Sequence, residues 1–199
     1  SSANNTLSLE VADKAFLQKN TAGSLMQNLS RLPGVGSMDI GSGQSKPVIR
    51  GLGFNRVAVA ENGIKHEAQE WGADHGLEID QFSVERVEVI KGPASLMYGA
   101  NAIGGVIDLK QISTPLRNSS SRNIMLHTQT NKQLLIASGK LHKRFDHFYM
   151  KVNGSYFDYS DYRIPADSIT YMTYNIKLKN NRLRNTAGRD RSGNITLGY

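Results

Sequence analysis

The chain has 199 residues, of which 39% are hydrophobic, and its formal net charge is +7. It holds no cysteine, which excludes disulfides and thiolate metal sites, and no run approaching the ~20 apolar residues of a membrane-spanning helix. This length allows one large domain or two small ones.

The charge is divided unevenly along the chain. Residues 1–112 hold 10 Lys and Arg against 12 Asp and Glu, whereas residues 113–199 hold 14 against 5. A shift of this size, beside the polar stretch 113–121, predicts a domain boundary near Ile112. The basic residues of the second part are spread over alternating segments and a loop rather than gathered on one helix, so we expect no nucleic-acid partner.

The first part reads as a series of short elements punctuated by glycine and proline. We expect, in chain order, a strand at 7–11, a helix from Thr21 as N-cap to about Leu32, a loop at 35–45, a strand at 48–50 and a strand at 56–61. Asn62-Gly63 then predicts a tight hairpin. Residues 66–80 are irregular, with Asp80 as the cap of a short turn.

The stretch at 84–109 has the strongest local pattern, reading VERVEVIKGPASLMYGANAIGGVIDL. Its opening run alternates, with Val87 and Val89 on one face, which predicts a strand buried on at least one side. Gly92-Pro93 breaks that strand and starts a short helix. Gly104-Gly105 allows a bend into a second apolar strand. The stretch is a compact α+β unit without a catalytic arrangement.

These residues also carry a resemblance. VERVEVIKGPASLMYGANAIGGVI resembles the end of the plug domain of TonB-dependent outer-membrane receptors, where the wording RVEVxxGPxSxxYGxxAxGGVI recurs. Ile49-Arg50-Gly51, and SLMQNLSRLPGV at 24–35, resemble two further signatures of that family, in the family's order. The resemblance covers residues 11–109. It implies that residues 1–112 form an α+β plug domain, a small mixed sheet with short helices.

The resemblance further implies contacts between the plug and a barrel. In the family the Arg of the Ile-Arg-Gly signature faces the barrel wall and pairs with carboxylates there, and its match here is Arg50. We expect Arg86 and Glu88 to make plug–barrel contacts as well. The alternative, from the residues alone, is that Arg50 is a solvated charge after a short apolar strand.

After residue 112 the pattern changes to longer alternating segments. Residues 147–157 place apolar and aromatic side chains on one face and polar ones on the other, and 194–199 repeat this. The other segments are weaker strands at 124–129 and 134–141, turns at 130–132 and 143–146, and an exposed basic loop at 158–191. An apolar outer face and a polar inner face are what a transmembrane barrel strand needs. A soluble sheet with one wet face has the same periodicity and stays open as an alternative.

Four such strands cannot close a barrel. Plugged outer-membrane transporters use 22 strands, and an open sheet edge is not tolerated in lipid. We therefore expect residues 113–199 to be the first antiparallel β-strands of an incomplete 22-stranded transmembrane β-barrel, and the sequence to be a piece of a longer chain. The TonB-contacting segment, which in the family precedes the plug, would lie before residue 1.

Residues 61–80 hold the candidate cargo site. Six carboxylates and two imidazoles stand there against the single cation Lys65. This composition suits a divalent cation, and imidazole favours zinc or copper over magnesium. The expected metal ligands are His66, Glu67, Glu70, Asp74, His75 and Glu78. The alternatives are a solvated acidic loop, or an organic cargo such as haem packed against Trp71.

The resemblance implies a transporter that performs no bond chemistry, and the sequence has no P-loop, dinucleotide fingerprint or nucleophile elbow. We expect TonB-dependent uptake of zinc, copper, an iron–siderophore or haem across the outer membrane of a Gram-negative bacterium, with no required cofactor. The implied partners are TonB with an ExbB/ExbD-type energising complex, outer-membrane lipid and lipopolysaccharide. The alternative is a soluble periplasmic or secreted metal-binding module built from the same α+β unit.

Overall fold

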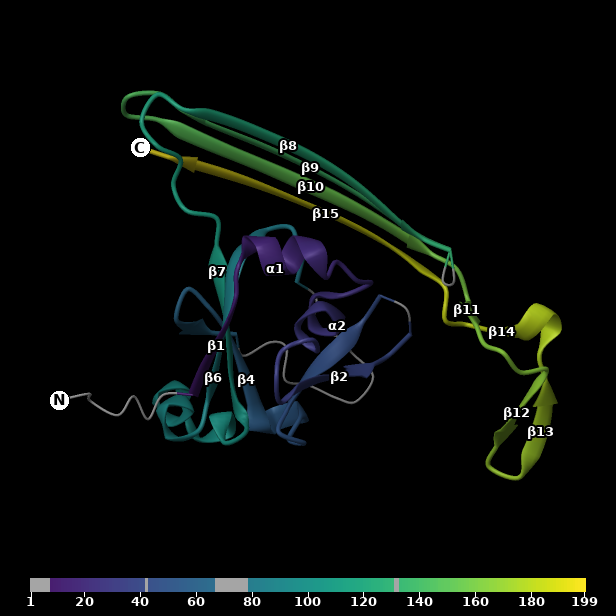
Figure 1. Cartoon of the computed structure of the whole chain (residues 1–199). Coiled ribbons are helices and arrows are strands. Elements are labelled where there is room, and N and C mark those ends of the chain that lie inside the picture. Colours follow the sequence, from purple (N-terminus) through teal and green to yellow (C-terminus); the bar gives the residue numbers. More distant parts are fainter. Residues whose placement is uncertain (1–7, 42, 67–78, 131–132) are drawn as a thin grey trace.

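The structure is a computed structural model that describes residues 8–41, 43–66, 79–130 and 133–199 (Figure 1). A five-stranded mixed sheet lies in the N-terminal unit, which we define as residues 8–112, and a four-stranded antiparallel sheet follows, which we call the wall sheet. In Figure 1 the wall sheet lies over the N-terminal unit, with α1 (Lys14–Lys19) on the side that faces it. No helix in the described ranges is long and apolar enough to cross a membrane.

The sheet of the N-terminal unit is built around the predicted strands at 84–109. Its strands are, in spatial order, β1 (Ser8–Ala12), β6 (Val84–Lys91), β7 (Gly105–Gln111), β4 (Val57–Glu61) and β5 (Ile64–Lys65). β4 and β7 pair in parallel and the other neighbours are antiparallel. The alternation predicted for β6 is confirmed, because Val87 and Val89 are fully buried.

Two glycines allow the chain to enter β7 after its connection from β6. Pro93–Tyr98 forms the predicted short helix, as a 3₁₀ helix, and Ala100–Ala102 adds a second 3₁₀ turn. Gly105 has φ +146, and a Cβ there would lie 2.8 Å from both Ile49 Cδ1 and Ile90 O. A Cβ on Gly104 would lie 2.8 Å from Arg56 O. The close approach of β7 to its neighbours therefore requires both glycines.

The two helices differ from the single helix that the sequence predicts. α1 begins after Asp13, whose side chain accepts the Phe16 N–H at 2.8 Å. α2 (Leu25–Leu29) begins after Ser24, whose Oγ accepts the Gln27 N–H at 3.2 Å. The predicted N-cap Thr21 is wrong, because its hydroxyl donates backward to the Leu17 and Gln18 carbonyls at the end of α1. Thr21 therefore ends one helix instead of starting the next.

The main core lies between this sheet and the helices. Its larger members include Leu25, Met26, Leu29, Ile49, Val87, Val89, Ile107 and Leu109. β2 (Val35–Asp39) and β3 (Ser45–Ile49) form a separate hairpin beside α2. The predicted loop at 35–45 is therefore wrong at its two ends, which belong to β2 and β3. Backbone pairing and the buried ends Val35 and Ile49 hold this hairpin together despite its Gly and Ser content.

The wall sheet confirms the predicted antiparallel strands. Its order is β15 (Gly188–Gly198), β10 (Tyr149–Tyr159), β9 (Leu134–Arg144) and β8 (Ser120–Gln129). β9 continues through Arg144, so the turn falls after 144 rather than at 143–146, and β15 begins six residues before the predicted 194. Both extensions are polar, and ladder pairing with β10 accounts for them.

The segment 160–187 joins β10 to β15 at one end of the wall sheet (Figure 1). The sequence predicts an exposed loop without regular structure at 158–191. This is wrong in part, because paired strands occupy some of the segment. They are β11 (Tyr162–Arg163) with β14 (Arg182–Leu183), and β12 (Ser168–Tyr171) with β13 (Tyr174–Lys177). A short run of alternating Tyr, Ile and Thr is enough for such a hairpin.

Candidate functional site: the interface between the N-terminal unit and the wall sheet

The face of the wall sheet that meets the N-terminal unit is polar toward the β9–β10 turn and apolar toward the 160–187 end. On β10, Lys151, Asn153 and Ser155 are each at most 8% exposed. These are the residues that the alternation assigns to the inner face. His142 on β9 shares a hydrogen bond of 2.9 Å with Asn153 Oδ1, and Ser155 Oγ lies 2.6 Å from Ser192 Oγ on β15. The inner face therefore satisfies many of its polar groups within the sheet and leaves few for the N-terminal unit.

The hydrogen bonds that cross the interface between described residues lie far apart. Lys151 Nζ donates to the Ile112 carbonyl at 2.7 Å, and the Tyr162 hydroxyl donates to the Gly41 carbonyl at 3.4 Å. Between them, the Phe82 and Phe157 rings lie 5.7 Å apart, at the edge of a small apolar cluster on the wall sheet. The charge-assisted bond from the Lys151 ammonium contributes ~1.5–3 kcal/mol and the neutral bond from Tyr162 ~0.5–1.5 kcal/mol, so these contacts hold the unit weakly compared with its own core.

Two cavities separate the N-terminal unit from β10 and β15. The first has a volume of 340 Å³ and is lined by Glu61, His66, Lys151, Asn153 and Thr196, among others. The second, of 320 Å³, lies nearer the 160–187 end and is lined by residues that include Gln44, Gln81, Phe157, Asp190 and Arg191. Ile79, Asp80 and Ser192 line both cavities. The cavities therefore follow one another along the wall, with Asp80 at their junction.

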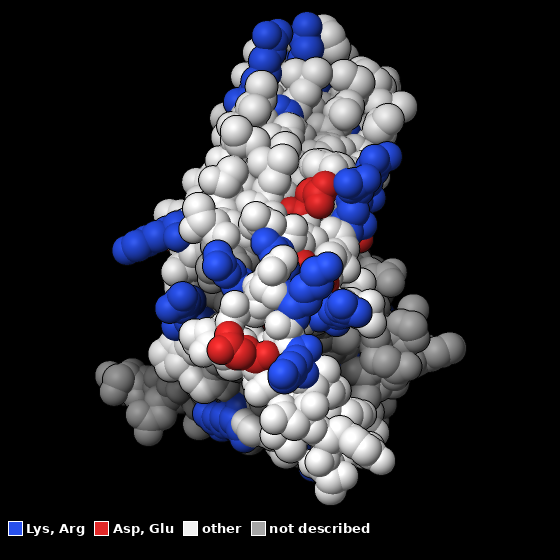
Figure 2. Space-filling view, turned by 90° about the vertical axis from the view of Figure 1, so that its right-hand side faces the viewer, with Lys and Arg blue, Asp and Glu red and all other residues white. Residues whose placement is uncertain are grey.

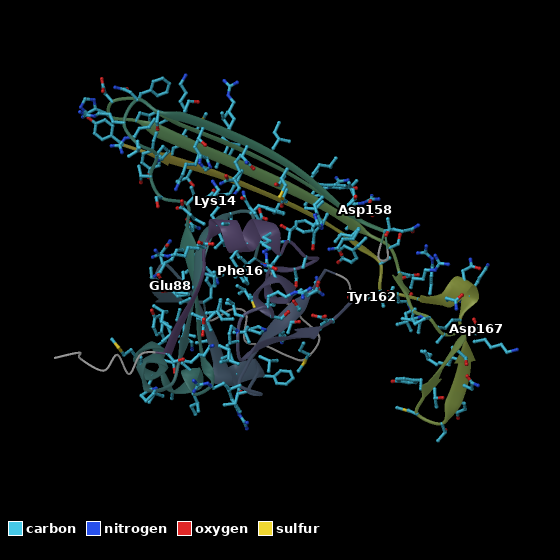
Figure 3. All side chains as sticks on the ribbon, in the orientation of Figure 1. Lys14, Phe16, Glu88, Asp158, Tyr162 and Asp167 are labelled. Carbon is cyan, nitrogen blue, oxygen red and sulfur yellow. The ribbon has the colours of Figure 1, made fainter. Side chains whose placement is uncertain are left out.

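A third cavity, of 30 Å³, lies where the helices meet β8 and β9. Lys14 of α1, beneath the wall sheet in Figure 3, lines it together with Lys140. Asn28 Oδ1 and Ser138 Oγ are buried there without a hydrogen-bond partner among the described residues. This part of the interface is thus polar and incompletely paired.

The predicted metal site is only partly within the described residues. His66 Nε2 lies 2.9 Å from Glu61 Oε2, and both side chains line the first cavity. The other expected ligands, Glu67, Glu70, Asp74, His75 and Glu78, lie outside the described residues, as does Trp71. Within the described ranges no three His, Asp or Glu side chains are grouped so that they could hold a metal ion. The metal site stays a prediction.

Asp80 caps a turn, as predicted. Its Oδ1 accepts the Phe82 N–H at 2.9 Å, and its carbonyl accepts the Ser83 N–H at 3.0 Å. This turn fixes the start of β6 and places Asp80 at the junction of the two cavities.

The residues expected to touch a barrel wall lie at the surface of the N-terminal unit. Arg50 is exposed, at φ +50 in the turn after β3. Arg86 Nη2 lies 2.7 Å from Glu88 Oε1, and Lys110 Nζ lies 3.7 Å from Glu88 Oε2. Arg86 and Glu88 are thus paired within the unit, and their contact with a barrel, like that of Arg50, stays a prediction.

Sequence reasoning missed a buried carboxylate, Asp108 on β7, which is fully buried. Its Oδ1 accepts the Gly63 N–H at 3.0 Å, and its Oδ2 accepts Lys110 Nζ at 2.6 Å and the Tyr98 hydroxyl at 3.2 Å. The hydrogen bond to Asp108 raises the pKa of Lys110. Burial, with Asp108 adding to it, raises the pKa of Tyr98. The sequence signal was one acid within the apolar run GVIDL.

Comparison with known proteins shows which family this chain resembles. The family model of the TonB-dependent Receptor Plug Domain matches residues 1–106. The vitamin B12 transporter BtuB of Vibrio vulnificus (strain YJ016) is 33% identical over 120 residues, which cover 59% of this chain and 19% of the relative. The vitamin B12 transporter BtuB of Photobacterium profundum is 32% identical over 102 residues, or 51% of this chain and 17% of the relative.

Solved structures share the fold over both parts. The Serratia marcescens hemophore receptor HasR, in complex with its hemophore HasA and heme, matches 96% of this chain with a TM-score of 0.74 at 20% identity. The copper transporter OprC matches 78% with a TM-score of 0.66 at 21% identity. The chain covers 28% and 25% of these two proteins. It thus spans about a fifth to a quarter of the length of the proteins it matches. Since the plug-domain match covers more than half of its residues, the chain belongs to the TonB-dependent outer-membrane receptors, a family of transporters and receptors, and its N-terminal unit is the plug.

Proposed function

We propose that the chain serves TonB-dependent uptake of a scarce nutrient across the outer membrane of a Gram-negative bacterium, without bond chemistry of its own. Its partners are TonB with an ExbB/ExbD-type complex, outer-membrane lipid and lipopolysaccharide. The cargo is a transition metal ion or a metal chelate. The observation that carries the proposal is the arrangement of the interface, where a plug with its own hydrophobic core meets a partly polar wall through widely spaced hydrogen bonds and two cavities.

The geometry explains how a pull on the plug would open a path. The bond from Lys151 to the Ile112 carbonyl and the bond from Tyr162 to the Gly41 carbonyl lie at widely separated points of the interface. The strands of the plug, by contrast, are joined by continuous ladders. Because separate weak bonds break one at a time, the plug can shift along the wall before its own sheet is lost. The two cavities along β10 and β15 are then the first space to widen.

Charge at the 160–187 end favours an anionic chelate over a bare cation. On that face blue Lys and Arg side chains outnumber red acidic ones (Figure 2). The segment 160–187 holds five cations, at Arg163, Lys177, Lys179, Arg182 and Arg184, and only two carboxylates, at Asp161 and Asp167. A surface of one sign raises the local concentration of ligands of the opposite sign. Among proteins of similar fold, the ferric enterobactin receptor PfeA is solved with enterobactin and HasR with heme, whereas OprC is a copper transporter.

Binding calorimetry on the full-length receptor tests the cargo class. Iron–siderophore chelates, haem, zinc and copper are titrated into the parent and into a variant with His66→Ala and His75→Ala. For a bare metal held by imidazole, the double variant loses binding. For an anionic chelate, binding persists in that variant and weakens in Arg182→Gln with Arg184→Gln. A receptor that binds none of these would contradict the proposed cargo class.

A further inference from the structure

Two cations stand near the β9–β10 turn on the outer face of the wall sheet, away from the plug. Arg122 of β8 and Lys143 of β9 are both exposed, at positions that alternate with the buried inner face. In the ladder Lys143 pairs with Ser120 and Arg122 pairs with Leu141. The two cations are therefore diagonal neighbours, with Cα atoms about 7–8 Å apart. One phosphate group can reach both side chains from this spacing.

Neither cation has an acidic partner among the described residues. The Arg122 side chain makes no hydrogen bond or ion pair with any of them, and Lys143 Nζ contacts the Phe145 ring, 4.7 Å from its centroid. Asp146 is the carboxylate of the adjoining turn. It is already engaged, since its Oδ1 accepts Asn118 Nδ2 at 3.0 Å and lies 3.8 Å from Arg117 Nε. The outer pair therefore lacks a counter-charge within the described protein.

The surroundings of this pair are apolar on one side and aromatic on the other. Toward the middle of the strands the same face exposes Ile124 (89%) and Leu126 (70%), and Ile195 (70%) lies on this face at the level of Arg122. At the turn, Phe145 and Phe148 stack with centroids 6.5 Å apart, and His147 stacks on Tyr199 at 6.1 Å. A membrane barrel shows an apolar outer band bordered by aromatic residues at the interface. Arg122 and Lys143 thus stand at headgroup depth.

The end of the sheet identifies the leaflet. The connection from the plug, residues 112–119, enters the wall sheet at this end, and the turn between β9 and β10 is four residues long. The long segment 160–187 lies at the opposite end (Figure 1). In outer-membrane barrels short turns face the periplasm and long loops face outward. The pair therefore lies in the periplasmic leaflet, which is built of phospholipids.

We propose that Arg122 and Lys143 bind the phosphate of an anionic phospholipid, such as phosphatidylglycerol, in the periplasmic leaflet. This inference rests on the proposed outer-membrane function, because a barrel is what places this face against lipid. An anionic headgroup supplies the missing counter-charge while its acyl chains cover the exposed Ile and Leu side chains. Each cation near an anionic membrane surface strengthens binding by roughly fivefold, and two by roughly thirtyfold.

Native mass spectrometry of the full-length receptor tests the site. The receptor is equilibrated with equal amounts of phosphatidylglycerol and phosphatidylethanolamine, and the bound lipids are counted. We expect the parent to prefer phosphatidylglycerol. In the double variant Arg122→Gln with Lys143→Gln, the preference for phosphatidylglycerol over phosphatidylethanolamine should decrease, by roughly thirtyfold at most. The matched control, Lys177→Gln with Lys179→Gln, removes the same charge from the segment 160–187 and should keep it. Lys143→Arg retains the positive charge and should also retain the preference for phosphatidylglycerol. This variant controls for an effect of substitution at this position on folding.

Three results would overturn the lipid site. They are no preference in the parent, an unchanged preference in the outer-face double variant, and displacement of phosphatidylglycerol by equimolar inorganic phosphate, which would make the pair a general anion site. Cargo uptake in cells separates this inference from the proposed function. The outer-face double variant should import cargo at the parental rate. A receptor that fails to import while retaining phosphatidylglycerol refutes the transport proposal and leaves the lipid site standing.

Discussion

Replacing Gly105 with alanine should destabilise the plug strongly, through two effects that the structure separates. At φ +146 a side chain is strained, which amounts to about 1–3 kcal/mol. Its Cβ would also lie 2.8 Å from Ile49 Cδ1 and from Ile90 O, and such overpacking costs roughly another 1–3 kcal/mol. The expected total is ~2–6 kcal/mol, and Gly105→Val should lie at the upper end.

Gly99 is the matched control for this prediction. It has φ +108, and nothing lies within 4 Å of a Cβ placed there, so Gly99→Ala carries the strain without the contacts. Urea unfolding of residues 1–112, followed by circular dichroism, measures both variants. Gly105→Ala should lose at least 1 kcal/mol more than Gly99→Ala, about the lower bound for overpacking. Equal losses would show that the approach of β7 to Ile49 is not tight, and the reasoning would fail.

Three further predictions concern the same unit and the wall sheet. Asp108→Asn should lower the free energy of unfolding by ~1–3 kcal/mol, because Lys110 loses its buried partner, and a loss below about 0.5 kcal/mol in urea unfolding would contradict this. The Ser113 N–H and hydroxyl hold the pKa of Glu85 below its ordinary 4.5, so this contribution is complete above pH 4.5 and is lost as the pH falls through the lowered value. Unfolding from pH 7 to 3 should show a smaller acid loss in Ser113→Ala, and an identical profile counts against it. Limited proteolysis should leave residues 1–112 intact, whereas 113–199 alone should aggregate in water, and a monomeric, protease-resistant 113–199 would refute the barrel assignment.

Local sequence patterns were sufficient to predict most of the fold. The alternation in β6 and the glycine pair at 104–105 predicted strand, short helix, bend and strand in the right order. The inward positions of Lys151, Asn153 and Ser155 on β10 also followed from alternation alone. Each of these signals depends on residues within a few positions of one another, which is why one sequence was enough.

Elements fixed by tertiary pairing escaped prediction. α1 is six residues long, which is too short for its apolar residues to show a helical repeat. The signal that the sequence offers is Asp13 as its N-cap. The hairpin of β2 and β3 is hidden by Gly and Ser because its stability comes from pairing and from burial against α2. The site was harder still. Alternation indicates that Lys151 points inward, but not that it meets the Ile112 carbonyl, since that contact depends on how two distant units pack.

The central claim is that this plug belongs to a receptor that imports its cargo with energy from TonB. The most direct measurement is uptake of a labelled iron chelate, haem, zinc or copper by cells that carry the full-length receptor, with and without TonB. We expect accumulation above the receptor-free background for one of these cargoes, and we expect deletion of TonB to abolish that accumulation while binding at the cell surface persists. Equal accumulation in both strains, or accumulation that does not depend on the receptor, would contradict it.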